Sequence, residues 1–540
     1  MTRHNHGRFL LGSALALSMA MAVGAQAQTL RVAIAAPPTS LDPHFHNLGP
    51  NNAAMRNIYD RLIHMDANMR LQPGLAVSWT PLDDTTWEIK LREGVTFHDG
   101  TPFGAEDVLF TIARIPQVPN SPSALTRFVS RIAEAEAPDS HTLILRTTAP
   151  APLLPNDLAQ FSILSLETTE AYLAANPGIA DSIYLIDSSH FNSGALAVGT
   201  GPFRVLSWAP GDLMRLAANA DYWDGAPAFA EAVVRPISND AARLAALLSG
   251  DVDLIDGLPT ADIANVRAND RLTVFEAPSN LAIYLHMDSD RDSSPYVRGA
   301  DGAEIANPLR DQRVRQAMSM ALNRDGIARV IMDGAAQPAG QMLAPGFAGA
   351  SDNLPAPAFD ADGARALLTE AGYPNGFSIT LHGPNDRYVN DERIAQAVAQ
   401  NLSRVGIRTQ VSVEPGATYF GAATRLDYSV MLLGWGSSTG EQGSTLDALL
   451  RTHDRDLGHG SANRGRFSDE RFDQMIGAAM QVLDETERNA QVAAAAEYVI
   501  GEQVGVIPIH FQMNFWAARQ GIEMTPRADN YTVLSEISAN

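Results

Sequence analysis

The stretch FSITLHGPNDRYVNDERIAQAVAQNLSRVGIRTQVSV (377–413) decides the fold class. FSITL (377–381) and IRTQVSV (407–413) alternate apolar and polar residues, as half-buried strands do. Between them, residues 391–405 place Ile394, Val398 and Leu402 on one helical stripe. Strand, helix and strand at these lengths predict a βαβ unit, and therefore a parallel sheet with a right-handed crossover.

The same mixture of elements continues on both sides of this unit. Helices are predicted at 104–115, 240–249, 311–322 and 360–371, and strands at 30–34, 85–91 and 427–433. Asp311 and Asp360 stand where N-caps belong, and Gly372 stands where a helix would stop. The chain is therefore predicted to be α/β throughout.

Composition excludes several classes of protein. The 540 residues suffice for two or three lobes, and 45% of them are apolar. Cysteine is absent, which excludes disulfides and zinc–thiolate sites, and Lys90 is the only lysine, which disfavours a P-loop. A net charge of −22 disfavours binding to nucleic acid, so no nucleic-acid partner is expected.

The first residues predict a secretory signal peptide, residues 1–27. Arg3 and Arg8 precede an apolar run from Phe9 to Val23, and Ala25-Gln26-Ala27 has the small-x-small pattern of a cleavage site. No later stretch is long and apolar enough to span a bilayer. A periplasmic location is expected, with no membrane span in the mature chain.

Seven segments, in order along the chain, together resemble one family, the extracytoplasmic solute-binding proteins of ABC importers of the peptide/nickel type. These segments are LQPGLAVSW (71–79), TTWEIKLREGVTFHDGTPFGAEDVLFT (85–111), GTGPFRV (199–205), YWDG (222–225), DAARLAALLSGDVDLI (240–255), RVRQAMSMALNR (313–324) and ALLTEAGYPNG (366–376).

The resemblance implies a two-lobed periplasmic-binding-protein fold of the large type II class with a third, inserted α/β lobe. Lobe I would comprise residues 28–60, 196–275 and 508–540, the inserted lobe 61–195, and lobe II 276–507. The implied function is a receptor that captures an oligopeptide or similar polar organic solute by hinge closure. It would act as a monomer, without a cofactor, and deliver the solute to the membrane subunits of an ABC permease.

Trp435 is the first candidate contact residue. Ligands of open α/β sheets bind beyond the carboxyl ends of strands, and the strand predicted at 427–433 leads into Gly434-Trp435-Gly436. The resemblance places such a Gly-Trp segment in the cleft, and Gly436 and Ser437 would present backbone groups beside the ring. Peptide-binding members carry an aspartate three residues after this tryptophan, where Ser438 stands here. Glu441 could replace that acid or could be a solvated loop residue.

Further candidates come from three other places. The resemblance assigns 38–47 to an early cleft loop, which makes Phe45 and Asn47 candidate lining residues. Asn280 and Tyr284 begin the second lobe, and Tyr284 fits the cleft or the core equally well. The Arg464 guanidinium could bind a ligand carboxylate, although a structural ion pair is the favoured interpretation in an acidic protein.

Two alternative functions stay open. A receptor for a metal or metal chelate would use histidines such as His44 and His46, although no compact metal-ligand motif is present, and no metal site is predicted. A secreted hydrolase would need a catalytic group, but G-x-S-x-G and H-E-x-x-H are both absent. No catalytic residue is predicted, and the protein is not expected to be an enzyme.

Overall fold

A computed structural model describes residues 29–455 and 457–540 of the chain, and the predicted signal peptide lies outside them. The predicted βαβ unit is confirmed. Strands β15 (Phe377–Pro384) and β16 (Ile407–Glu414) pair in parallel, and helix α11 (Asp391–Arg404) packs on both of them. The buried residues of α11 include Ile394, Val398 and Leu402, the stripe that the spacing predicts.

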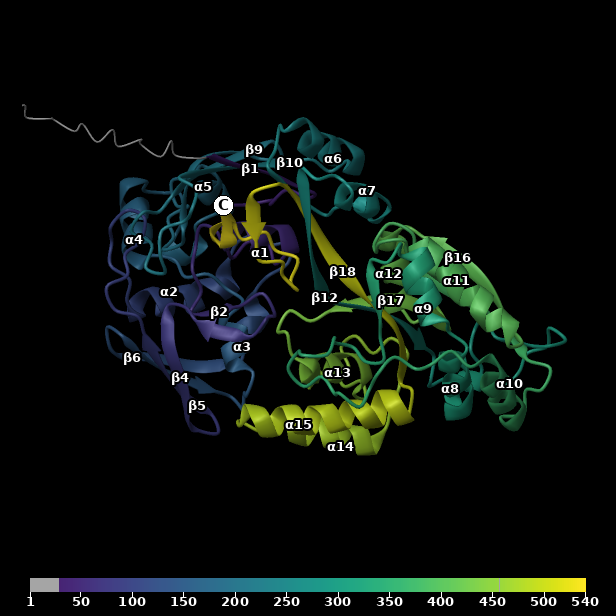
Figure 1. Ribbon diagram of the computed structural model, residues 1–540. Coiled ribbons are helices and arrows are strands. Elements are labelled where there is room, and N and C mark those ends of the chain that lie inside the picture. The colour runs from purple at the N-terminus through teal and green to yellow at the C-terminus, as the bar shows by residue number, and fades with distance from the viewer. Residues whose placement is uncertain (1–28, 456) are drawn as a thin grey trace, which may run out of the picture.

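A sheet of twelve strands runs through most of the described chain (Figure 1). Its order is β13-β15-β17-β12-β18-β11-β1-β10-β9-β8, with β16 paired to β15 and β14 paired to β18. Besides β15 and β16, its strands are β1 (Thr29–Ile34), β8 (Phe203–Ala209), β9 (Leu213–Ala218), β10 (Glu231–Pro236), β11 (Leu254–Asp256), β12 (Leu272–Met287), β13 (Arg298–Gly299), β14 (Ala336–Pro338), β17 (Val430–Gly436) and β18 (Val506–Arg519).

Strands β12 and β18 join the two halves of this sheet. They are antiparallel and long, with 16 and 14 residues, and they cross the centre of the molecule (Figure 1). Their pairing register shifts between Pro278 and Ala282, which marks a bulge in the middle of β12. The lobe borders expected at 275/276 and 508 fall inside these strands, and as borders between moving lobes they stay predictions.

A separate sheet forms the side of the molecule that carries the early chain. Its order is β4-β5-β7-β6, from β4 (Ala76–Asp83), β5 (Thr86–Leu91), β6 (Ile132–Asp139) and β7 (Thr142–Thr147). Helix α2 (Ala105–Arg114) begins beside it, and the Asp107 carboxylate accepts from the Gly104 N–H at 2.8 Å. Two short pairs complete the strands of the described chain: β2 (Ile63–Met65) with β3 (Leu71–Pro73), and β19 (Ile522–Met524) with β20 (Ile537–Ala539).

The other helices lie around these two sheets (Figure 1). They are α1 (Gly49–Met55), α3 (Leu154–Leu158), α4 (Leu166–Ala175), α5 (Ser188–Asn192), α6 (Asp240–Ser249), α7 (Ile263–Arg267), α8 (Gln312–Met320), α9 (Arg324–Gly326), α10 (Ala361–Glu370), α12 (Gly416–Thr424), α13 (Gln442–Leu450), α14 (Glu470–Ala479) and α15 (Glu485–Ala496). Separate cores form where α8, α10 and α11 cover one face of β12 and β17, and where α13, α14 and α15 cover the other.

The strand predicted at 427–433 is placed wrongly. Strand β17 begins at Val430 and continues through Gly436, so Trp435 belongs to the strand and not to a loop after it. The reason is the ladder with β12, in which Gly434, Trp435 and Gly436 pair with Ile283, Ala282 and Leu281. A neighbouring strand can hold glycines extended, which local pattern alone does not reveal.

A buried ion pair ties the early loop to the small sheet. The Arg114 guanidinium, at the end of α2, donates to both oxygens of Asp42 at 3.0 and 2.6 Å, and neither side chain is exposed. The same guanidinium donates to Nδ1 of His44 at 2.9 Å. Because Asp42 is the only acid paired with Arg114 in the described chain, removing its charge leaves a buried cation without a counter-ion.

Asp42→Asn should therefore lower the free energy of unfolding by about 3–5 kcal/mol, the usual cost of breaking a buried pair. Urea denaturation followed by far-UV circular dichroism measures this loss. Asp221→Asn, at an exposed position, serves as the control and should change stability little. A loss for Asp42→Asn no larger than for the control would contradict this role of the pair.

Candidate functional site

Trp435 lies half-buried on the face of β17 that packs against α13, α14 and α15. Its indole N–H donates to the Thr445 hydroxyl of α13 at 3.2 Å, which fixes the orientation of the ring. Gly436 follows in an exposed position with no atom closer than 3.8 Å to the place of a Cβ. The Trp435 ring and the open backbone of Gly436 therefore lie side by side at this strand end, as expected.

The loop after β17 contacts both the crossing strand and the small-sheet side of the molecule. The Asn280 amide, in the bulge of β12, donates to the Ser437 carbonyl at 2.7 Å. Gln160 donates to the Ser438 carbonyl at 3.0 Å, and Arg127 donates to the exposed Ser438 hydroxyl at 3.2 Å. Ser437 is buried and is held through its carbonyl, whereas Ser438 is exposed and is held through both its carbonyl and its hydroxyl.

Glu441 is neither a solvated loop residue nor a free carboxylate. It is 1% exposed and is the N-cap of α13, where its two oxygens accept from the Gly443 and Ser444 N–H groups at 2.5 and 2.8 Å. Burial raises the pKa of this carboxyl group, and the two amide donors act against that rise. The expectation that Glu441 replaces the missing acid at position 438 is not supported, because the helix start already engages both oxygens.

Arg464 is a cation without a counter-ion. Its side chain forms no ion pair or hydrogen bond with the described residues, and its Nε is buried without a partner. The favoured expectation of a structural ion pair is therefore wrong, because the short loop 462–467 holds Arg464 away from acidic side chains. Asn463 closes that loop by bonding the Arg451 and Phe467 carbonyls, and Gly465 lies so close to β12 that a Cβ would meet the Met287 oxygen at 2.2 Å.

Aromatic side chains surround Arg464. Its guanidinium lies over the Phe420 ring, 5.9 Å from the centroid. Burial raises the pKa of Tyr388 and of Tyr284, and the positive charge of Arg464 opposes both rises. Tyr284 is 1% exposed and belongs to the core, which decides between the two interpretations of this residue. Tyr388 was not expected; its ring packs on Gly434, where a Cβ would approach it to 2.6 Å.

Phe45 and Asn47 lie half-buried on the loop before α1, beside the segment 121–123. Ser121 donates to the Phe45 carbonyl at 2.6 Å, and the Asn47 N–H donates to the Ser123 carbonyl at 2.8 Å. The Asn47 side chain accepts from Asn52 of α1 at 3.0 Å. Both residues are thus held at the junction between α1 and the loop that leads to Arg127.

His44 and His46 do not form a metal site. His44 is fully buried, and its ring lies between Arg114 and the Ser162 carbonyl, at 2.9 and 2.8 Å. Burial and the neighbouring Arg114 lower the pKa of His44 to about 4, so the ring is neutral at pH 7. Across residues 29–455 and 457–540, no group of three or more His, Asp or Glu side chains is arranged to hold a metal ion.

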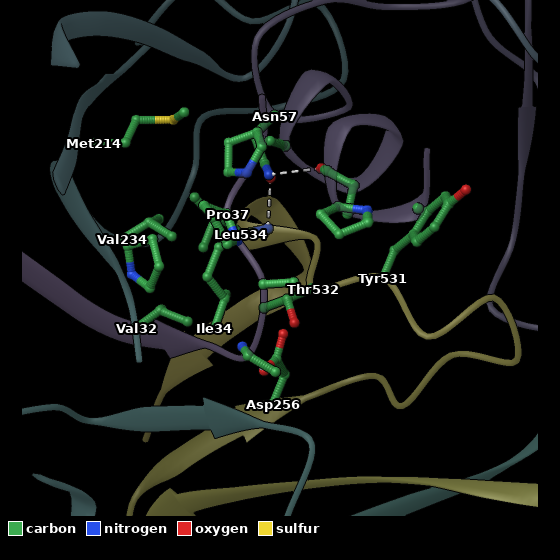
Figure 2. Close-up of a pocket in the computed structure, with 18 of the residues that line it drawn as sticks. Val32, Ile34, Pro37, Asn57, Met214, Val234, Asp256, Tyr531, Thr532 and Leu534 are labelled. Atoms are coloured by element: carbon green, nitrogen blue, oxygen red, sulfur yellow. Dashed lines mark hydrogen bonds between the residues drawn. The ribbon is translucent and has the colours of Figure 1, made fainter. Parts of the chain in front are cut away.

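A pocket of about 200 Å³ opens at the carboxyl ends of the parallel strands β1, β10 and β11 (Figure 2). Its walls are mostly apolar and include Ile34, Pro37, Trp208, Val234 and Tyr531.

Asp256, the last residue of β11, is one of the two acids that line this pocket, and its carboxylate reaches into the pocket from below (Figure 2). One carboxylate oxygen accepts from the Ala35 N–H at 2.6 Å, and the other has no hydrogen-bond partner among the described residues. The nearby Arg243 guanidinium is engaged by Asp240 and by the Ile237, Asp256 and Gly257 carbonyls. Burial raises the pKa of Asp256 to about 6.

The bulge of β12 connects this pocket with the Trp435 region. The Asn280 N–H donates to the Ala528 carbonyl at 3.1 Å, and Asp529, Asn530 and Tyr531 then line the pocket. The loop 436–438 thus contacts Asn280 in the bulge of β12, whereas Asp256 pairs with Trp516 further along β18. Phe45 and Asn47 lie on the loop before α1, and Glu441 and Tyr284 are occupied in the start of α13 and in the core.

Comparison with known proteins identifies the family. Residues 70–456 match the profile described as bacterial extracellular solute-binding proteins, family 5 Middle. The chain belongs to this family. It is 28% identical to the glutathione-binding protein GsiB of Escherichia coli K12 over 519 residues, which cover 94% of this chain and 93% of that protein.

Solved structures share the fold. HbpA2 from Haemophilus parasuis superposes with a TM-score of 0.81 at 22% identity, covering 95% of this chain and 100% of that one. DppA from Helicobacter pylori, in complex with the peptide STSA, gives 0.71 at 23% identity, covering 95% and 98%. The predicted fold class and the predicted function, a solute-binding receptor of an ABC importer, are confirmed at this level. No helix of the described residues is long and apolar enough to cross a membrane.

Asp256, Tyr388 and Arg127 were missed from the sequence. The rule that led to Trp435 also applies to Asp256, because VDLI (252–255) follows the predicted helix 240–249 and Asp256 stands at its carboxyl end. Tyr388 comes from a loop and Arg127 from the short 3₁₀ helix Thr126–Phe128. The positions of both depend on distant contacts, and no local signal distinguishes them.

Proposed function

We propose that the protein is a periplasmic receptor that captures an oligopeptide or similar polar organic solute carrying both an amino group and a carboxylate. The solute binds between the two halves joined by β12 and β18 and is then delivered to the membrane subunits of an ABC permease. The receptor acts as a monomer and forms no covalent bond. The signal peptide expected at residues 1–27 would export it.

One observation carries this proposal: two side chains of opposite charge, each with free hydrogen-bonding capacity, lie on the two sides of the expected hinge. Arg464 has no ion-pair partner beside β12 and β17. Asp256, at the end of β11, feels the charge of Arg243 but forms no ion pair with it, and one of its carboxylate oxygens has no hydrogen bond among the described residues. A buried or half-buried charge is costly without a partner, so each position is prepared for a ligand group of the opposite charge. A solute with both groups would satisfy both positions only when it lies between the two sides.

Closure of the two halves would strengthen these contacts. Excluding water lowers the local dielectric, so the carboxylate–Arg464 and ammonium–Asp256 attractions grow as the cleft closes. Trp435 and Tyr388 would supply apolar contact for the body of the solute. The serine at position 438 removes the acid that peptide-binding relatives place there, and Asp256 would take over the ammonium group from the opposite side.

The relatives support a solute of this chemistry. The matched protein of Escherichia coli is named for glutathione, and the matched DppA structure holds a peptide, and both ligands carry amino and carboxylate groups. In this chain the assignment of each group to Arg464 or Asp256 is our proposal.

Removing one charge at a time from protein and ligand tests the assignment. Isothermal titration calorimetry would use glutathione and the dipeptide Met-Leu, each also as its N-acetyl and C-terminal amide forms. Arg464→Gln should weaken binding of the free-acid forms by about 2–5 kcal/mol and should abolish the preference for acid over amide. Asp256→Asn should weaken binding of the free-amine forms by a similar amount and should abolish the preference for free amine over acetylated amine.

Arg404→Gln, on the exposed end of α11, and Asp262→Asn serve as charge-matched controls and should change neither preference. Trp435→Ala should weaken all forms alike, by about 2 kcal/mol, because it removes apolar contact only. If the preference for the free acid survives in Arg464→Gln, the carboxylate is bound elsewhere.

The pH dependence gives a second, independent test. Only the ionised form of Asp256 attracts an ammonium group, and the pKa of this carboxyl group in the free protein is about 6. Affinity for a solute with a free amino group should therefore fall as pH decreases through about 6, and it should level off above. Titrations between pH 5 and 8 should show this fall, and Asp256→Asn should remove it. An equal fall in Asp256→Asn would assign the dependence to another group.

A further inference from the structure

The small sheet is fixed to the half of the molecule that contains β1. The buried pair of Arg114 and Asp42 joins α2 to the loop after β1. The His98 ring, between β5 and α2, forms a hydrogen bond of 2.9 Å with the Gly201 carbonyl before β8. When β12 and β18 bend, the small sheet should therefore move together with β1 and β8.

The loop 437–440 belongs to the other half, where it leads from β17 to α13, and two buried amides of the small-sheet side contact it. The Asn156 amide of α3 donates to the Thr439 carbonyl at 3.0 Å. The Gln160 amide, just after α3, donates to the Ser438 carbonyl at 3.0 Å and to the Asn156 carbonyl at 3.2 Å. Because the donors are neutral and the acceptors are backbone carbonyls, these contacts need neither a charge nor a particular side chain in the loop.

Gly440 lets the main chain of this loop approach the turn before β3. Its φ is 67°, and a Cβ there would come within 2.7 Å of the Met69 Cβ and 2.9 Å of the Met69 carbonyl oxygen. Glycine avoids both the strained backbone and the clash. The loop thus contacts the small-sheet side at three successive residues, Ser438, Thr439 and Gly440.

A cavity of about 650 Å³ adjoins these contacts. Asn156, Thr439 and Gly440 belong to its lining, together with the start of α15. Among the described residues, the second half contributes only two apolar side chains, Phe347 and Leu483, to the packing around the small-sheet core. The two halves therefore meet here through a few contacts beside a cavity, and contacts of this kind within one chain can separate and form again.

We propose that the loop 437–440 is a latch, which holds the two halves together in part of the free protein before a solute binds. This inference goes beyond the proposed function, because the latch joins protein groups to protein groups and uses neither Arg464 nor Asp256. Trp435 and Gly436 lead directly into the loop. For a solute that binds between the halves, as in the proposed function, the apparent Kd is the intrinsic Kd divided by the latched fraction. A weaker latch therefore raises the Kd of every such solute by the same factor.

The distance between two spin labels tests the latch in the full mature chain, refolded from urea to remove any retained solute. The chain has no cysteine, so Asp84→Cys, at the exposed turn between β4 and β5, and Thr486→Cys, at the exposed start of α15, accept one label each. Double electron–electron resonance should detect a short-distance population, which is the latched form. Asn156→Leu combined with Gln160→Met removes both amide donors at similar size and should lower the ratio of short to long distances about tenfold.

Two further variants give a control and an independent check. Gln410→Met, at an exposed position on β16, should leave the ratio unchanged. Gly440→Ala blocks the approach from the side of the loop and should also lower the ratio, whether or not the substitutions at α3 disturb the small sheet. The proposal is overturned if the parent protein shows no short-distance population, or if the double variant and Gly440→Ala both keep that population at the parent's level.

Titrations with glutathione and Met-Leu separate the latch from the binding site. In the double variant of Asn156 and Gln160, the Kd of both solutes should rise by the factor by which the short-distance fraction falls, and the preference for acid over amide should stay. A loss of that preference would assign the two amides to the solute and would overturn the latch. If neither solute binds, the proposed function fails, and the distance measurement still decides on the latch.

Discussion

The long antiparallel pair of β12 and β18 is the constraint on which the rest of the structure depends. Because these two strands belong to both halves of the large sheet, each half can move only by bending or twisting them. The bulge between Pro278 and Ala282 places that deformable point at Asn280, which bonds the Ser437 carbonyl on one side and Ala528 on the other. In the function that we propose, the solute would bind where the two halves approach each other, between Arg464 and Asp256.

The partners of Arg464 and Asp256 can be compared with those of the other charged side chains in the described chain. Two buried cations are paired with acids, Arg114 with Asp42 and Arg527 with Asp529 and Glu536. The buried Arg61, Arg324 and Arg488 form no ion pair with the described residues and donate to backbone carbonyls instead. Arg243 is likewise engaged by carbonyls and by Asp240. Arg464 differs from all of these because its side chain forms neither an ion pair nor a hydrogen bond with the described residues, and Asp256 keeps one carboxylate oxygen without a hydrogen bond. A receptor needs no nucleophile, which fits a chain without cysteine and with one lysine.

The sequence predicted most of the fold because its elements carry strong local signals. The βαβ unit at 377–413 and the helix over 240–249, with Gly250 at φ 84° as its cap, needed only periodicity and capping residues. The site was predicted less well, because unpaired charges are a property of tertiary contacts. Arg464 was expected in an ion pair, and Glu441 was expected either to replace the missing acid or to lie in a solvated loop. The position of each depends on tertiary contacts, namely the loop around Gly465 and the start of α13. The strand-end rule could have identified Asp256, but its strand has only three residues and therefore a weak sequence signal.

Native mass spectrometry of the protein purified from the organism that produces it tests the central claim most directly. The claim is that the chain holds one small organic solute, with an amino group and a carboxylate, between its two halves. The predicted result is a complex of one chain and one such molecule, released on denaturation and identified by its mass, with Arg464→Gln and Asp256→Asn purified free of it. A retained metal ion, or a solute without either charged group that both variants keep, would contradict the claim.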